Sequence, residues 1–376
     1  MAYRVVVAGS GIVGASTAYH LSIRGAAVTV VDRPRDGQAT RAGAGIVCPW
    51  VDHDGDEAWY RLAREGARYY PVLAKLLDGD GDGEPEIGYA SVGAILVAED
   101  PSELAGVENL LRHRRPSAPE MGEVTVIDRP VEVFPPLSPD LVGLRVGGAA
   151  RVDGRTVRDT LMRAALRRGA VELTGAVELT ATGTPLLDGS PIDADAVVVA
   201  AGAWTGELCL PLGHTLAIGP ARGQIVHAEL PGAETAGWPI ILPRRGPYLL
   251  GFPGSRVVLG ATVEDAGFDS RVTVGGIAEV LAGAVRLAPG LAGATLVESR
   301  SGLRPMTADG IPLLGRLQGR SGGRVVVATG LSAYGLTAGP YSGLVAACLA
   351  LDEPPPLDVT PYAPDREVTP YAPDRG

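Results

Sequence analysis

"VVVAGSGIVGASTAYHLSIRGAAVTVVD" occupies residues 5–32 and decides the fold of the first part of the chain. Its valine-rich start predicts a buried strand, and the stretch that follows predicts a helix from about Ile12 to Arg24. A second strand is expected over Ala27–Val31. Strand, helix and strand in this order predict the start of a doubly wound α/β fold with a parallel sheet.

Three glycines and one acid in this stretch are typical of a dinucleotide pocket. Gly9 permits a tight turn after the strand, Gly11 lets the backbone approach a pyrophosphate, and Gly14 lets the helix pack on the strand. Asp32, at the end of the second strand, can accept hydrogen bonds from a ribose diol, and its charge would repel the 2′-phosphate that Arg33 alone would attract. The motif alone does not separate a nicotinamide from a flavin dinucleotide.

Length and charge narrow the class of protein. A chain of 376 residues is expected to form two domains or one large α/β body. The formal net charge of −10 argues against a nucleic-acid binder, which would show a basic face. "RHRRP" at Arg112–Pro116 is the densest basic run, and we interpret it as a solvated loop rather than a binding patch.

Neither a metal site nor a membrane segment is predicted. Cys48, Cys209 and Cys348 lie far apart, so each is expected to be a small buried residue, and their odd, small number suits a reducing compartment. "DGDGDGEP" at Asp78–Pro85 lacks the ligand spacing and closing Glu of a calcium loop. We expect no signal peptide and no membrane span, which makes the cytoplasm the expected location.

The rest of the chain predicts a split architecture. Further buried, parallel-type strands are expected at Ala194–Trp204 and Arg324–Leu331, and β-rich stretches lie between the α/β pieces. We therefore expect an α/β, Rossmann-type dinucleotide-binding domain made of residues 1–85, 145–217 and 297–376. An interleaved α+β substrate-binding domain, built on an antiparallel sheet, is expected from residues 86–144 and 218–296.

A repeat closes the chain, within the proline-rich tail 359–376. "VTPYAPDR" at Val359–Arg366 recurs at Val368–Arg375. Two proline-rich copies cannot add a core. We interpret the second copy as a duplication without function, and the alternative is a recognition motif.

Several segments together resemble the D-amino acid oxidase and glycine oxidase family of flavoenzymes. "SGLRPMTADGIPLLG" at Ser301–Gly315 and "VVVATGLSAYGLTAGPYSG" at Val325–Gly343 are similar to the family's C-terminal signature. The resemblance extends over nearly the whole chain in the family's order. It includes "RAGAGIVCPW" at Arg41–Trp50, "AAGAWT" at Ala200–Thr205, "PARGQ" at Pro220–Gln224 and "GATVEDAGFD" at Gly260–Asp269.

The resemblance implies FAD, bound by the first domain and kept during turnover. Sarcosine oxidase relatives attach their flavin through a cysteine after the third-segment signature, where this chain has Met306, so we expect non-covalent FAD. The implied cofactor-binding residues are Gly9, Gly11, Ile12, Val13, Gly14, Asp32, Arg33, Arg41, Ala42, Gly45, Ile46, Val177, Ala201, Gly202, Trp204, Gly302, Arg304, Gly330, Tyr334, Gly335, Leu336 and Thr337.

The implied activity is oxidation of the CH–NH group of a small D-amino acid, glycine-like or imino acid. The α-hydrogen passes as hydride to the flavin N5, and the imine then hydrolyses. Arg304, in "GLRP", matches the family arginine that binds the substrate carboxylate; the alternative is a structural ion pair with Asp309. Tyr248 and Tyr334 are expected to frame the pocket, with core packing as their alternative.

Two departures bear on substrate and electron acceptor. Ala333 stands where some glycine oxidases carry a basic residue, which indicates a less polar pocket with room for a larger side chain. Lys75 is the only lysine and is not expected near the flavin, so oxygen or another carrier takes the electrons without help from a lysine. A tailoring amine oxidase or dehydrogenase of a biosynthetic pathway, a flavin-binding protein without turnover and a nicotinamide reductase remain as alternatives.

Overall fold

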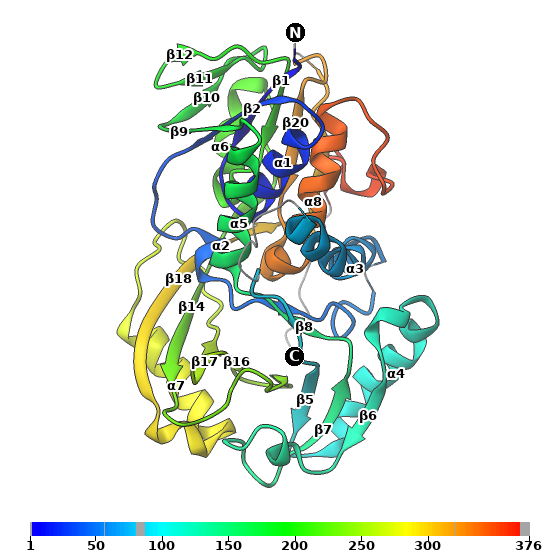
Figure 1. The fold of residues 1–376 in the computed structure, drawn as a ribbon, viewed down its shortest axis with the longest axis vertical. Coiled ribbons are helices and arrows are strands. Elements are labelled where there is room, and N and C mark those ends of the chain that lie inside the picture. Colours follow the sequence, from blue (N-terminus) through cyan, green and yellow to red (C-terminus); the bar gives the residue numbers. More distant parts are fainter. Residues whose placement is uncertain (1, 56, 80–86, 320, 369–376) are drawn as a thin grey trace.

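Two sheets organise the computed structural model, which describes residues 2–55, 57–79, 87–319 and 321–368 (Figure 1). The first sheet has six strands and matches the predicted Rossmann-type core. Its strands are parallel except for β19, which is antiparallel to β20. In spatial order they are β19 (Leu313–Arg316), β20 (Val325–Thr329), β13 (Ala196–Val199), β1 (Arg4–Ala8), β2 (Ala27–Asp32) and β9 (Val171–Thr174).

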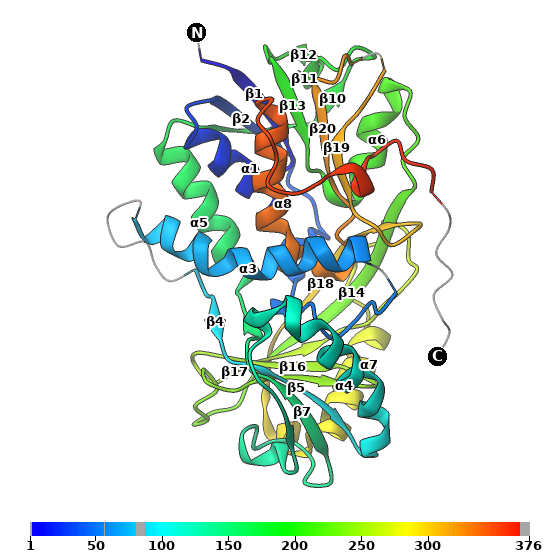
Figure 2. The same ribbon diagram turned by 90° about the vertical axis from the view of Figure 1, so that its right-hand side faces the viewer.

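Helices cover this sheet because their contact faces carry small residues. In α1 (Ile12–Ser22) all eleven residues are buried, between α5 (Gly154–Arg167), α8 (Gly335–Ala350) and the sheet. At the crossing of α1 and α8, a Cβ on Gly343 would lie 2.5 Å from the Cβ of Ser16, so the approach requires glycine. Figure 2 shows α3 (Glu57–Gly79) lying across the molecule between the two bodies.

The start of α8 differs from the prediction. The sequence "TAGPYSGLVAACLAL" predicts a helix with Pro340 in its first turn, whereas the observed helix begins at Gly335 and the proline lies in the second turn. A proline there has no N–H to donate to the carbonyl four residues earlier, which is that of Leu336. The buried hydroxyl of Tyr70, from α3, donates to this carbonyl instead. A side chain from the neighbouring helix therefore satisfies the group that the proline leaves unpaired.

The second sheet has eight strands and supplies the antiparallel framework expected of the substrate side. Every neighbouring pair is antiparallel except β15 and β5. One face packs on α7 (Val274–Leu287), whose Val280 and Ala284 are buried with the sheet's apolar residues. The order is β18 (Thr295–Thr307), β14 (Ile218–Glu229), β17 (Arg256–Gly260), β16 (Tyr248–Phe252), β15 (Ile240–Pro243), β5 (Ala94–Ala98), β7 (Val142–Val146) and β6 (Val124–Ile127).

Smaller elements complete the fold. The described residues also form two three-stranded sheets and three further α-helices. The sheets consist of β10 (Val177–Leu179), β11 (Pro185–Leu187) and β12 (Ser190–Pro191), and of β3 (Ile46–Val47), β8 (Ala150–Arg151) and β4 (Ala90–Ser91); the helices are α2 (Ala39–Ala42), α4 (Ala105–Arg114) and α6 (Thr205–Cys209).

The predicted segment boundary at residue 297 falls inside a single strand. β18 pairs with β14 along its length, from Thr295 opposite Glu229 to Thr307 opposite Ile218. Residues 297–307, which we expected in the dinucleotide-binding domain, therefore extend the eight-stranded sheet. A 13-residue strand can reach from one body to the other, and this one carries Arg304 to the junction between them.

The interpretation of Arg112–Pro116 as a solvated loop is wrong. Arg112 and Arg114 belong to α4, and Arg114 is only 6% exposed. Its guanidinium donates to the backbone carbonyls of Trp50 at 2.8 Å, Asp52 at 2.7 Å and His53 at 2.5 Å. It also lies over the ring of Tyr60, 3.8 Å from the ring centroid. The basic run thus contains one residue that fixes a distant loop.

The first copy of the tail repeat is an ordered part of the fold. Tyr362 is fully buried and donates to the carbonyl of Ala58 at 2.6 Å. Arg366 forms two hydrogen bonds with the carboxylate of Asp309, at 2.9 and 3.0 Å. The second copy, apart from Val368, lies outside the described residues, as does most of Asp78–Pro85.

We expect Arg366→Ala to lower the free energy of unfolding by about 2–3 kcal/mol, because it leaves the Asp309 carboxylate unpaired. The two side chains are only 13% and 10% exposed. Urea denaturation of the holoprotein measures the change. Arg112→Ala, which removes an ion pair with Glu108 in which the arginine is 67% exposed, is the control and should change the free energy of unfolding by less than about 1 kcal/mol. Equal losses in the two variants would contradict the prediction.

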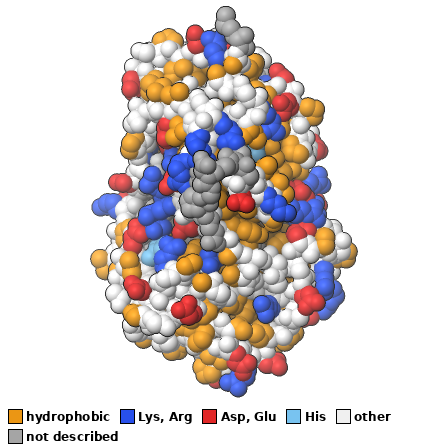
Figure 3. All heavy atoms as spheres, in the orientation of Figure 1, with side chains coloured by type: hydrophobic (Ala, Val, Ile, Leu, Met, Phe, Trp, Pro, Cys, Tyr) orange, Lys and Arg blue, Asp and Glu red, His pale blue; other side chains and the backbone are white. Residues whose placement is uncertain are grey.

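The cysteines, the helices and the surface can each be compared with what the sequence predicts. Cys48, Cys209 and Cys348 are all buried, as predicted. In the described part of the chain, no helix combines the length and the hydropathy that crossing a membrane requires. Figure 3 shows acidic and basic side chains interspersed over one face, with exposed hydrophobic side chains between them.

Candidate active site

The turn between β1 and α1 is built for a closely approaching ligand. Gly9 has φ +103°, and a Cβ there would lie 2.5 Å from the carbonyl oxygen of Ala200. A Cβ on Gly14 would lie 1.9 Å from the carbonyl oxygen of Gly9. Gly11 has an ordinary backbone conformation, so its role is to leave the backbone uncovered. The first and third glycines are thus required by the turn itself, as the motif predicts.

Asp32 is oriented at the end of β2 by its neighbours. Its carboxylate accepts hydrogen bonds from the hydroxyl of Ser10 at 2.6 Å and from the amide of Ser10 at 3.2 Å. The amide of Arg33 donates to the other oxygen at 2.9 Å. These bonds fix the carboxylate beside the glycine turn, where it faces the open cavity. The arrangement suits the recognition of a ribose diol.

A cavity of about 680 Å³ runs from this turn to the junction of the two sheets. Its volume lies within the usual range for cofactor and ligand sites. The structure brings most of the predicted site residues to its wall. These are Gly9, Gly11, Ile12, Val13, Asp32, Arg33, Ala42, Gly45, Ile46, Val177, Ala201, Gly202, Trp204, Tyr248, Gly302, Arg304, Tyr334, Gly335 and Leu336.

Four predicted cofactor residues lie off the cavity wall. Gly14 packs behind the turn, and a Cβ on Gly330 would lie 2.6 Å from Thr307. Thr337 is buried and donates from its hydroxyl to the carbonyl of Ile46 at 2.8 Å. Arg41 is exposed, and its Nε donates to Gln38. Gly14, Gly330 and Thr337 support elements that form the wall, and Arg41 points elsewhere.

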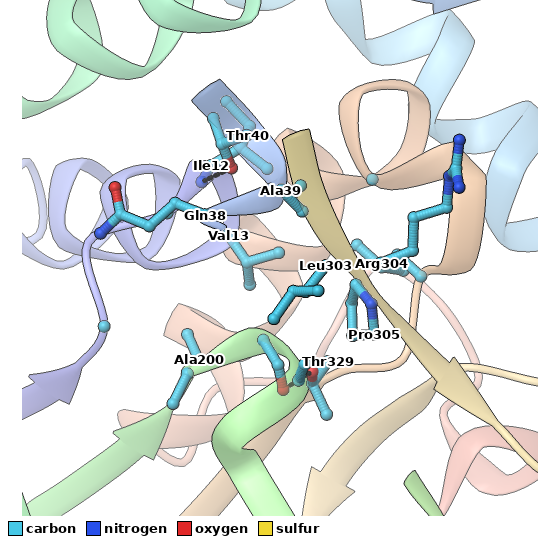
Figure 4. Close-up of a pocket in the computed structure, with 18 of the residues that line it drawn as sticks. Ile12, Val13, Gln38, Ala39, Thr40, Ala200, Leu303, Arg304, Pro305 and Thr329 are labelled. Carbon is cyan, nitrogen blue, oxygen red and sulfur yellow. Dashed lines mark hydrogen bonds between the residues drawn. The ribbon is translucent and has the colours of Figure 1, made fainter. Parts of the chain in front are cut away.

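Sequence reasoning missed several wall residues, and Figure 4 shows some of them. Thr40, on α2, accepts a hydrogen bond from the amide of Ile12 at 3.0 Å, so it caps α1 from another segment. Arg35 lies over the ring of Trp204, 5.1 Å from its centroid. Thr329 donates to the carbonyl of Gly202 at 3.0 Å. No local motif marks such residues, because each contributes through a partner far away in the sequence.

Arg304 reaches the cavity from β18 without a carboxylate partner. Its guanidinium donates to the carbonyl of Thr262 at 3.0 Å and to that of Arg222 at 3.3 Å. Among the described residues no acid lies within ion-pair distance of it. Asp309, the predicted alternative partner, pairs with Arg366. That alternative is therefore wrong, and Arg304 keeps donors available for a ligand anion.

Glu264 holds in place the two segments whose carbonyls accept hydrogen bonds from Arg304. Its carboxylate accepts hydrogen bonds from Arg222 at 2.6 Å, from Gln224 at 2.7 Å and from the hydroxyl of Thr262 at 2.5 Å. Arg222 and Glu264 also exchange two backbone hydrogen bonds of 2.9 Å. Hydrogen bonds thus join the segments "PARGQ" and "GATVEDAGFD" into one network. This network sets the position of the Arg304 guanidinium.

Tyr248 lies on β16, in contact with the cavity. Burial raises the pKa of its hydroxyl to about 12, opposed by the nearby charge of Arg304. The hydroxyl therefore keeps its proton at neutral pH, and it makes no hydrogen bond with the described residues. It is available to donate to the same ligand anion as Arg304.

Tyr334 also lines the cavity. Its ring packs edge-on against Trp59, with 4.4 Å between ring centroids, and its hydroxyl donates to the carboxylate of Asp52. Burial and the Asp52 charge raise the pKa of Tyr334 well above its usual value. Burial also raises the pKa of the Cys48 thiol, which lines the cavity as an uncharged group.

The residues present fit a flavin dinucleotide. The glycine turn and the N-terminus of α1 suit a pyrophosphate, and Asp32 suits a ribose. The cavity continues past Ala42, Gly45 and Ile46 to Arg304, so it extends well beyond the pyrophosphate turn. In the described residues no group of His, Cys, Asp and Glu has a metal-site arrangement.

Fold and cavity together define a dinucleotide-binding protein, and comparisons with known proteins identify its family. Residues 4–349 match the family model described as "FAD dependent oxidoreductase". The chain therefore belongs to this family, and FAD is its cofactor.

Named relatives cover nearly the whole chain. The Bacillus subtilis uncharacterized oxidoreductase YurR is 44% identical, covering 96% of this chain and 98% of its own. A glycine oxidase of Pseudomonas putida is 30% identical over 97% and 99% of the two chains. The crystal structure of an iminodiacetate oxidase from Chelativorans sp. BNC1 superimposes with a TM-score of 0.92 and 43% identity, over 96% of this chain and 99% of that one.

Proposed function

We propose that the protein oxidises the CH–NH group of a small amino or imino acid. The single observation that carries the proposal is Arg304, an arginine without a carboxylate partner that reaches the cavity of the glycine turn. The resemblance to glycine oxidase and to iminodiacetate oxidase supports an amine that bears a carboxylate. FAD, when bound, supplies a ring that accepts two electrons and the α-hydrogen. We propose that it is bound without a covalent link.

The chain's own residues bind and orient this substrate. Arg304 receives the carboxylate through two N–H donors, which sets which face of the α-carbon points along the cavity. Tyr248 donates a further hydrogen bond to the same carboxylate. The apolar side chains of Ile225 and Leu242 line the same region and exclude water from it. Ala333, also on the wall, leaves room for a substituent on the α-carbon or the nitrogen.

The described cavity wall holds no lysine that could help oxygen react with the reduced flavin. Lys75 lies exposed on α3 and does not line the cavity. A charge that assists oxygen would have to come from another group, such as Arg304, or the electrons pass to a carrier other than oxygen. We therefore keep oxidase and dehydrogenase as two forms of the same proposal.

Anaerobic titration of the holoprotein tests the proposal. Glycine, sarcosine, iminodiacetate, D-alanine, D-proline and the L-enantiomers are added one at a time under argon, and the visible absorbance of the flavin is followed. We expect bleaching by at least one amino acid, and readmitted air then separates oxidase from dehydrogenase. Bleaching by NADH or NADPH alone would contradict the proposal and support a reductase. Acid precipitation should release the FAD if the link is non-covalent.

A further inference from the structure

The charges that line the cavity fall into two groups. Five of the charged residues lie at the dinucleotide end of the cavity: Asp32, Arg33, Arg35, Glu178 and Glu207. Arg35 interacts electrostatically with Arg33, Asp32 and Glu207, and Glu178 lies on β10, which packs against the helix of Glu207. At the other end, the charged side chains in the described part of the wall are those of Arg304 and Asp52. They form no ion pair with each other, so one cation and one anion face the space between them.

Asp52 and Arg304 belong to the same region of the cavity. Tyr334, which donates to Asp52, ends the short 3-10 helix Ser332–Tyr334. The hydroxyl of Ser332 lies 3.1 Å from the sulfur of Met306. Met306 is two residues after Arg304 on β18, so both side chains leave the strand on the same face. Through these contacts the Asp52–Tyr334 pair is fixed next to the strand that carries Arg304.

The loop that carries Asp52 is fixed in place. Arg114 donates to the carbonyls of Trp50, Asp52 and His53 in this loop, and it does so from a buried position off the cavity wall. His53 has φ +55° and stacks on Trp59, with 3.8 Å between ring centroids. Two independent contacts therefore hold the backbone of this loop, and the Tyr334 hydroxyl holds the exposed Asp52 carboxylate at the cavity wall.

From this arrangement we infer that Asp52 is a specificity-determining residue that recognises the positive charge on the substrate nitrogen. The inference rests on the proposed function, in which Arg304 receives the carboxylate. One cation and one anion match a zwitterion with a single carboxylate. A second carboxylate on the substrate would meet Asp52 and would find no further arginine at this end of the cavity. The site therefore selects monocarboxylic amino or imino acids over dicarboxylic ones.

Two ligands of the same shape test the recognition of charge. Trimethylglycine and tert-butylacetate differ by a charged nitrogen in place of a carbon, and calorimetry on the holoprotein measures their binding without turnover. We expect trimethylglycine to bind about fivefold more tightly, as for an exposed ion pair of favourable geometry. Asp52→Asn should bring the two affinities together. Asp54→Asn, an exposed neighbour off the cavity wall, should preserve the preference.

A second pair tests the exclusion of a further carboxylate. Iminodiacetate and its monoamide have the same shape but differ by one negative charge. Concentration dependence of anaerobic flavin reduction measures their apparent affinities. We expect the monoamide to bind about fivefold more tightly to the wild type and equally to Asp52→Asn. Asp54→Asn, which lies off the cavity wall, should again retain the wild-type preference.

The outcomes separate this inference from the proposed function. A charge preference that survives Asp52→Asn, or equal binding of both probes to the wild type, would overturn the inference while amine-dependent bleaching still stands. A preference that Asp52→Asn abolishes, with no amine able to bleach the flavin, would support the inference and overturn the proposed function. Failure of the wild type to bind either carboxylate probe would overturn both.

Discussion

Replacing Arg304 with alanine is expected to lower kcat/KM for the amino acid that bleaches the flavin by about 100- to 1,000-fold, the usual cost of truncating one partner of a charged, hydrogen-bonded pair. Its donors to the carbonyls of Thr262 and Arg222 hold the guanidinium ready before the substrate arrives. The loss should appear mainly in KM, with a smaller decrease in the rate of flavin reduction, because the carboxylate also sets the orientation of the α-carbon.

Two further variants make this prediction specific. Arg304→Lys keeps the charge but loses the two-point geometry, so an intermediate value of kcat/KM is expected. Arg300, on the same strand, pairs with Glu298 at 2.7 Å and does not line the cavity. Arg300→Ala should therefore retain the wild-type KM. An unchanged KM in Arg304→Ala, with FAD still bound, would show that the carboxylate binds elsewhere.

Gly9→Ala is expected to abolish FAD binding and to destabilise the protein by about 3–5 kcal/mol. The residue has φ +103°, and the added Cβ would lie 2.5 Å from a backbone oxygen that cannot move without displacing β13. Gel filtration followed by the ratio of flavin to protein absorbance measures retained cofactor, and thermal unfolding measures stability.

The matched control for Gly9→Ala separates backbone strain from collision. Gly25 also has a positive φ, +78°, but nothing lies within 4 Å of a Cβ placed there. Gly25→Ala should cost only about 1 kcal/mol of strain and should retain FAD. If both variants behave alike, the collision with Ala200 is not the decisive effect. If Gly9→Ala retains full FAD, the turn does not have the close packing on which the site depends.

The candidate site could be predicted where a local sequence rule dictates the geometry. Gly9 and Asp32 lie at fixed distances from a strand and a helix within one βαβ unit, so their roles follow from the local pattern. The family resemblance then pointed to Arg304 and Tyr334 at the far end of the chain. Both line the same cavity as the glycine turn.

Other residues could not be placed in this way. Arg114 lies in a basic run that is typical of a solvated surface, yet it is buried because three carbonyls of a loop about 60 residues earlier need donors. The boundary at residue 297 failed for a related reason. β18 continues its partner strand until Thr307, and strand pairing is a long-range property that composition does not reveal.

The sequence by itself determined the dinucleotide fold, because periodicity and glycine geometry act over short distances in the chain. The candidate arginine came from the resemblance to a known family. Only the tertiary structure decided which charges share the cavity. Asp52 and Arg304 line the same cavity from distant parts of the chain, and Asp309 pairs with Arg366 instead of Arg304. The physical reason is that the partner of a charged side chain is chosen by packing in space, whatever its distance in sequence.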